Sequence, residues 1–93
     1  MRITQSRSFE RKIKKFKKQE KKILDNHIKK IQDNPKIGQE RKGDLRSVYV
    51  YEFKIRTIQH LLSYRFVEEG LKLLMIGPHE NYYRDLKTYL KSR

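Results

Sequence analysis

The sequence contains no cysteine, so the chain can form neither a disulfide bond nor a thiolate metal site. Its three histidines, His27, His60 and His79, lack the i, i+4 spacing that places two imidazoles on one metal ion. No apolar run approaches the roughly 18 residues needed to span a bilayer, and the first residues lack the apolar segment of a secretion signal. We therefore expect a cytoplasmic protein that uses no metal and no other cofactor.

Acidic residues are also scarce. The 93 residues include 11 Asp and Glu against 24 Lys and Arg, which gives a formal net charge of +13. This length fits a single domain, residues 1–93, and 35% hydrophobic residues suffice for one small core. A field of this sign and strength attracts nucleic acid, an anionic membrane surface or an acidic protein. The composition predicts a polyanionic partner, although much of the charge could simply form the solvated faces of helices.

The N-terminal half is predicted to be mainly helical, after a short strand at residues 1–4. Two apolar stripes have helical spacing: the first consists of Phe9, Ile13 and Phe16, and the second of Ile23, Leu24, His27, Ile28 and Ile31. Asn34-Pro35 ends the second stripe, because a residue before proline avoids the helical conformation. The stripes permit one bent helix or two helices. We favour an antiparallel helical hairpin, because both apolar faces must pack on one sheet.

The C-terminal half is predicted to contain a sheet. Residues 36–46 form a loop with two glycines. Residues 48–55 and 58–67 alternate between two faces, as strands do, and Arg56-Thr57 between them fits a turn. Residues 71–76 are apolar at nearly every position, which is typical of a strand covered on both faces.

The last helix is expected to begin at His79, directly after Gly77-Pro78 stops the strand, with Leu86 and Leu90 as its apolar anchors. The predicted order of elements is therefore β-α-α-β-β-β-α, an α+β fold. We expect a small antiparallel sheet with the N-terminal helical hairpin and the C-terminal helix packed on one face, so that the other face is partly open.

This order resembles the RelE/ParE superfamily of type II toxin–antitoxin toxins. At residue level the resemblance rests on three segments: Lys42-Gly43-Asp44-Leu45-Arg46 before Val48-Tyr49-Val50-Tyr51, then Leu62-Ser63-Tyr64-Arg65, then Ile76-Gly77-Pro78-His79-Glu80-Asn81-Tyr82-Tyr83. The last is similar to the YafQ-type ending, in which a histidine is followed four residues later by an aromatic residue. Gln59 stands where the spacing back from Tyr64-Arg65 would place an acid in YafQ-type relatives.

The resemblance implies one of two activities. Ribonuclease members of the superfamily cut mRNA on the ribosome without a metal, whereas ParE members inhibit DNA gyrase and lack the catalytic residues. It also implies a cognate acidic antitoxin protein as partner, with mRNA and the ribosome, or alternatively DNA gyrase, as the target, and no membrane partner. A plain RNA-binding module of another fold is a third possibility, but the strands lack the aromatic ladder of such modules.

RNA cleavage by side chains needs a group that moves protons, and His79 suits this role because imidazole titrates near pH 6.5. If His79 acts as the acid, it needs a carboxylate neighbour, for which Glu80 and Glu52 are candidates. Alternatively, His79 has a structural role only, as a residue at a helix start that hydrogen-bonds the backbone.

The cleaved phosphate also needs positive charge. Arg65 can hold two phosphate oxygens with its fork of N–H donors, and Lys54 on the neighbouring strand can add a second charge. Tyr83, one helical turn beyond His79, can stack on a base or hydrogen-bond a phosphate. Alternatively, Arg65 pairs with Glu68 or Glu52. Six further basic residues are expected to bind RNA: Lys36, Arg41, Lys42, Arg46, Arg56 and Arg84.

Overall fold

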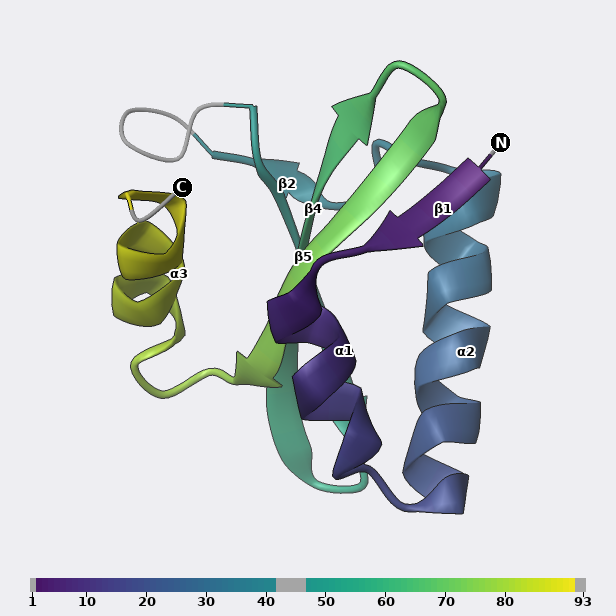
Figure 1. The fold of residues 1–93 in the computed structure, drawn as a ribbon. Helices are drawn as coiled ribbons and strands as arrows, with labels where there is room; N and C mark the ends of the chain where they lie inside the picture. The colour runs from purple at the N-terminus through teal and green to yellow at the C-terminus, as the bar shows by residue number, and fades with distance from the viewer. Residues whose placement is uncertain (1, 42–46, 92–93) are drawn as a thin grey trace.

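The computed structural model describes residues 2–41 and 47–91. Their elements are, in chain order, β1 (Arg2–Gln5), α1 (Arg7–Lys14), α2 (Lys18–Asp33), β2 (Gln39–Glu40), β3 (Tyr49–Ile55), β4 (Ile58–Val67), β5 (Gly70–Pro78) and α3 (Tyr82–Lys91). The strands form one sheet in the order β1-β5-β4-β3-β2 (Figure 1). The predicted α+β class and order of elements are confirmed, with the short strand β2 added. Within the described ranges, no helix is both long and apolar enough to cross a membrane.

The antiparallel strands β3, β4 and β5 form the centre of the sheet. Ile55 pairs with Ile58, so Arg56-Thr57 makes the expected two-residue turn. Arg56 has a φ of 59°, the positive value that tight hairpin turns require. Between β4 and β5 the register shifts at Ser63/Tyr64, which leaves an extra residue on β5. This bulge changes which residues of β5 face each side of the sheet.

Helices α1 and α2 form the expected hairpin, joined at residues 15–17. The Ser6 hydroxyl caps α1 by accepting a hydrogen bond from the N–H of Phe9 at 3.0 Å, and it donates to the Leu74 carbonyl at 2.5 Å. At the start of α2, the N–H of Lys17 donates to the Glu20 carboxylate at 2.7 Å. Each helix of the hairpin therefore begins with a hydrogen bond between a side chain and a backbone N–H, which marks two separate helix starts in the lysine-rich region.

The hairpin packs on one face of the sheet. Buried side chains from both helices and from β3, β4 and β5 meet there in a single cluster: Phe9, Leu24, Ile31, Tyr51, Phe53, Ile55, Leu62, Tyr64, Leu71, Leu73 and Ile76. His27 lies at the edge of this cluster, as expected for the apolar face of α2, with its Nδ1 2.6 Å from the Tyr51 hydroxyl. His60 is buried in the same layer between the rings of Phe16 and Phe53.

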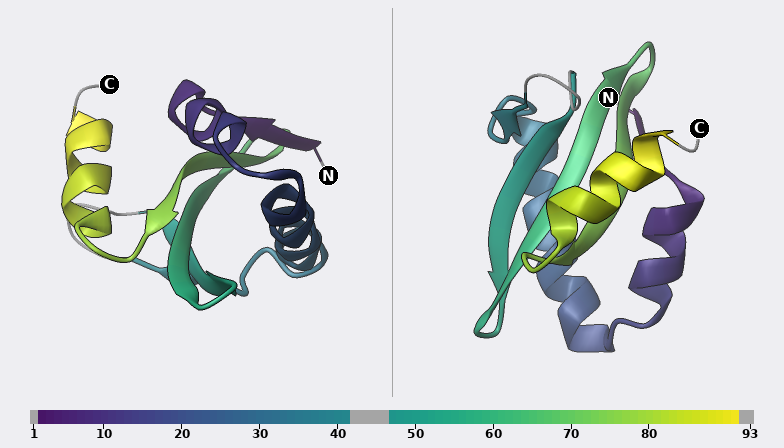
Figure 2. Two further views of the ribbon diagram at one scale, coloured as in Figure 1. Left: turned by 90° about the horizontal axis from the view of Figure 1, so that it is seen from below. Right: turned by 90° about the vertical axis from the view of Figure 1, so that its left-hand side faces the viewer.

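Helix α3 covers the opposite face, so that α2 and α3 lie on different sides of the sheet (Figure 2). A second cluster lies beneath it: Val48, Val50, Leu61, Leu74, Met75, Tyr82 and Leu86. The Tyr82 hydroxyl lies 2.8 Å from both the Ser63 hydroxyl and the Met75 carbonyl oxygen. Burial raises the pKa of Tyr82. The expectation that all helices pack on one face is wrong, because the apolar residues on both sides of β5 each need a cover.

Two predicted boundaries and the predicted antiparallel direction of one strand pair also differ. β5 continues through Pro78, α3 begins at Tyr82 rather than His79, and β1 pairs with β5 in the parallel direction, with Arg2 opposite Gly70 and Gln5 opposite Leu73. Proline is tolerated at the end of β5 because β1 reaches only to Leu73, so that its missing N–H faces no strand there. The turn between β5 and α3 contains Asn81, whose φ is 61°.

Candidate functional site

Backbone hydrogen bonds fix the position of His79 at the end of β5. Pro78 is the last residue of β5 in register with β4, where it pairs with His60. One residue further, the N–H of His79 donates to the Gln59 carbonyl at 3.1 Å, and the His79 carbonyl accepts from the N–H of Tyr82 at 3.2 Å. The side chain of His79 is exposed. The imidazole is therefore open to solvent on a backbone that is fixed at both sides.

Tyr83 lies next to His79, and Arg41 lies over the ring of Tyr83. The Tyr83 ring centroid is 6.3 Å from that of His79, with the planes at 85°. The guanidinium carbon of Arg41 lies 4.7 Å from the centroid of the same Tyr83 ring, within the range of a cation–π contact. The Arg41 N–H donates to the Val48 carbonyl at 2.8 Å, which ties this segment to the sheet. The phenol ring of Tyr83 is thus in contact with the imidazole of His79 and with the guanidinium of Arg41.

Lys54, Glu52 and Gln59 lie on the adjoining strands at the same end of the sheet. Lys54 is in register with Gln59, whose carbonyl accepts from His79. The Gln59 side-chain amide donates to the Glu52 carboxylate at 2.7 Å. Lys54 and Glu52 are both exposed. Glu52, one of the two carboxylates considered as a partner for His79, is therefore hydrogen-bonded to Gln59 instead.

Arg65 lies further along β4. It is separated from His60 by five residue steps, or about 16 Å at roughly 3.3 Å per residue. The structure brings His79 and Tyr83 together as expected, whereas it places Arg65 toward the other end of the strand, in register with Lys72. The Nε atom of Arg65 is buried and has no hydrogen-bond partner among the described residues. The Nε donor of Arg65 is buried and lies on a cation that is paired in register with a second cation, Lys72. This arrangement suits an anionic ligand.

Ion pairs do not account for these charges. The described residues form two ion pairs, both exposed, which join Arg2 to Glu69 at 3.4 Å and Arg84 to Asp85 at 3.7 Å. Neither involves Arg65 or supplies His79 with a carboxylate. In residues 2–41 and 47–91, no group of three His, Asp or Glu side chains gathers as a metal site would require.

The basic residues predicted to bind RNA are dispersed. Arg41 contacts Tyr83, and Arg84 pairs with its neighbour on α3. Lys36, after α2, and Arg56, in the β3–β4 turn, are exposed. Lys42 and Arg46 lie outside the described residues. Sequence reasoning missed two contacts, the stacking of Arg41 on Tyr83 and the bond between Gln59 and Glu52. The bond between Gln59 and Glu52 could have been predicted from strand alternation, because alternation places both side chains on the same face of the sheet, the one that α3 covers.

The sheet order, with a helical hairpin on one face and a short helix on the other, agrees with the RelE/ParE fold that the sequence resemblance predicts. Residues 3–87 match the model of the ParE-like toxins of type II bacterial toxin–antitoxin systems, so the chain belongs to that family. No curated protein sequence matches it.

Solved structures support the same fold. The intact RelBE toxin–antitoxin complex of E. coli matches with a TM-score of 0.65 at 15% identity, covering 84% of this chain and 95% of the other. The isolated RelE toxin of E. coli matches with a TM-score of 0.62 at 15% identity, over 92% and 95%. A conserved hypothetical protein of Helicobacter pylori matches with a TM-score of 0.53 at 19% identity, over 85% and 94%. At these identities the likeness concerns the fold alone.

Proposed function

We propose that this toxin is a metal-independent, ribosome-dependent mRNA endoribonuclease that blocks translation. The observation that carries the proposal is the exposed imidazole of His79, fixed by backbone bonds beside the Tyr83 ring that Arg41 covers. A fixed imidazole that is open to solvent can exchange protons with a substrate. The guanidinium of Arg41, on the Tyr83 ring, would supply the positive charge that an RNA phosphate needs.

The reaction expected at this site is a transesterification. The 2′-hydroxyl oxygen forms a bond to the adjacent phosphorus, and the bond from phosphorus to the 5′-oxygen breaks, which leaves a cyclic phosphate. The 2′-hydroxyl loses a proton and the 5′-oxygen gains one, and His79 carries out one of these transfers. Arg41 and Lys54 stabilise the charge that develops on the phosphate. Tyr83 supports a base by stacking or bonds a phosphate oxygen.

Arg65 is assigned to phosphate binding at a distance from the cut. Its buried, unpartnered Nε would gain a hydrogen-bond acceptor when RNA binds. The spacing along β4 makes Arg65 a contact to the phosphate of a neighbouring nucleotide rather than to the phosphate that is cut beside His79. Three other exposed basic residues, Lys36, Arg56 and Arg84, would add salt-dependent affinity.

The test is cleavage of a translated message by purified toxin and its variants. We expect His79→Gln to lower the cleavage rate by about 10²–10⁴-fold, the usual contribution of a general acid or base. Lys87→Gln, an exposed change on α3, serves as the control and should cleave as the wild type does. Full cleavage by His79→Gln, with a melting temperature equal to that of the wild type, would remove His79 from the mechanism.

The alternative is inhibition of DNA gyrase without catalysis, which the separation of Arg65 from His79 favours. Under that alternative, His79→Gln would still arrest growth, and DNA breaks would accumulate while messages stayed intact. Measuring breaks and message cleavage in the same cells distinguishes the two functions.

We also infer an acidic antitoxin as partner, because the net charge of +13 would be neutralised by it and because the chain belongs to a family of antitoxin-controlled toxins. Co-expression of the acidic product of a neighbouring reading frame should suppress growth arrest. Persistent arrest with every neighbouring product would contradict this inference.

A further inference from the structure

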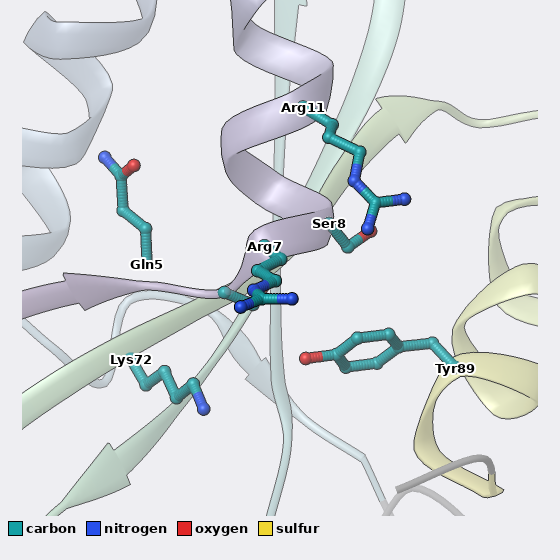
Figure 3. Close-up of a pocket in the computed structure, with 7 residues that line it drawn as sticks. Gln5, Arg7, Ser8, Arg11, Lys72 and Tyr89 are labelled. Carbon is teal, nitrogen blue, oxygen red and sulfur yellow. The ribbon is translucent and has the colours of Figure 1, made fainter.

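We infer that the pocket between α1, β5 and α3 binds phosphates of the RNA backbone, at a site separate from His79. The pocket has a volume of about 520 Å³, and its basic lining consists of Arg7 and Arg11 from α1 and Lys72 from β5. Figure 3 shows Tyr89 reaching into the same space from α3, with its hydroxyl directed toward Arg7. The inference rests on the proposed function for the identity of the ligand.

Charge repulsion within the pocket favours an anionic ligand. Arg7 and Arg11 are one helical turn apart on an exposed face of α1, so that their side chains are neighbours. Lys72 lies in register with Arg65 on β4, and like charges directly opposite each other on two strands are destabilising. None of these four cations takes part in the ion pairs found among the described residues. An anion in the pocket would contact Arg7, Arg11 and Lys72 and would offset the repulsion that Lys72 has from Arg65, which is not among the lining residues.

The lining favours a phosphate over an acidic peptide. Besides the cations and the Tyr89 ring, it contains only polar side chains, Gln5, Ser6 and Ser8, and no aliphatic residue. A peptide that folds as it binds must bury apolar side chains to offset its ordering entropy. A phosphodiester chain needs only charge and hydrogen-bond donors, which arginine forks supply.

The pocket is too far from His79 to act on the same phosphate. Lys72 and Pro78 are six residue steps apart on β5, or about 20 Å at roughly 3.3 Å per residue. The pocket would therefore hold the RNA several nucleotides from the cut. It would contribute affinity and register, with no part in bond cleavage.

The experiment measures binding of a fluorescent 2′-O-methyl oligoribonucleotide, which cannot be cut, to the full-length toxin across a range of salt concentrations. The test variant is Arg7→Gln with Arg11→Gln. The control is Lys18→Gln with Lys22→Gln, which removes the same charge at the same spacing from exposed positions of α2. All four positions are exposed, so unchanged melting temperatures should verify folding. Thermal stabilisation by inorganic phosphate alone is measured in parallel.

We expect the test variant to bind the oligonucleotide about tenfold more weakly at low salt. The slope of log affinity against log salt should fall by about 1.4, since each phosphate contact to a single strand adds about 0.7. The control should change affinity by less than about threefold. Equal losses in both variants would show that only total charge matters and would overturn the inference, as would unchanged binding in the test variant. Stabilisation by inorganic phosphate without this loss of oligonucleotide affinity would also overturn it, because the pocket would then hold free phosphate.

Failure of this inference can be separated from failure of the proposed function. If Arg7→Gln with Arg11→Gln binds normally while the wild type cuts messages, only the pocket assignment is lost. If the wild type cuts no message but the test variant shows the predicted loss of binding, the nuclease proposal is lost and the phosphate site remains.

Discussion

Removing one oxygen atom from Tyr82 should loosen α3 from the sheet. The Tyr82 side chain is 2% exposed, and its hydroxyl lies 2.8 Å from the Ser63 hydroxyl and from the Met75 carbonyl oxygen. Tyr82→Phe keeps the ring but leaves these buried groups without that partner. The expected loss is about 1–3 kcal/mol in the free energy of unfolding, which corresponds to about 4–8 °C in melting temperature for each kcal/mol in a domain of this size.

The neighbouring residue provides a matched control. Tyr83 is only half-buried, and its described contacts are ring contacts with Arg41, His79 and Tyr82, so Tyr83→Phe should change stability by less than about 0.5 kcal/mol. Urea unfolding followed by circular dichroism measures both variants. Equal stability of Tyr82→Phe and Tyr83→Phe would refute the reasoning, because it would show that the buried hydroxyl contributes nothing.

The same substitution should alter the response to alkaline pH. Burial raises the pKa of Tyr82 above the value of about 10 that it has in the unfolded chain. Its contribution to stability is therefore complete below pH 10 and is lost as the pH rises further, because the unfolded state then releases the proton more readily. Tyr82→Phe should lose less stability than the wild type between about pH 9 and pH 11. Parallel losses would contradict the assignment.

Three further changes test other parts of the fold. Burial, with help from Lys30, lowers the pKa of His27, so the wild type should lose stability as the pH falls below about 6.5, the unfolded value; His27→Gln should flatten the melting temperature between pH 7.5 and pH 5. Gly38→Ala should cost about 1–3 kcal/mol, because a Cβ there would lie 2.7 Å from the hydroxyl of buried Tyr64; a neutral result in urea unfolding would mean that the ring can move. Ser6→Ala should cost about 1–2 kcal/mol by removing the cap of α1, and Ser6→Thr, which keeps the hydroxyl, should recover most of that loss in the same assay.

Alternation of residue types was sufficient to predict β3 and β4. Tyr51, Phe53 and Ile55 face the helical hairpin, and Val48 and Val50 face the other side, as the pattern indicated. The same pattern contained the signal for the position of α3. Both faces of β3 and β5 carry buried apolar residues, so one helix had to cover the second face. The prediction instead placed all helices in a single layer on one face.

The arrangement of the candidate site depends on register, which residue types do not determine. Aligning Pro78 with His60 brings His79 to Gln59, and the bulge at Ser63/Tyr64 sets where Arg65 meets Lys72. A motif can place His79 and Tyr83 four residues apart, and here their rings do meet. It cannot report that Arg65 lies about 16 Å away along β4, nor that Arg41, from a segment without periodicity, stacks on Tyr83.

The parallel pairing of β1 with β5 joins a strand that is synthesised early to a strand that is synthesised late. Arg2–Gln5 has its partner only in residues 70–73, so a growing chain that has already displayed its first strand cannot close the sheet until those residues exist. At a translation rate of about 5–20 residues per second, that interval lasts about 4–15 s. The nascent toxin therefore lacks the β1–β5 edge of its sheet until residues 70–73 have been made.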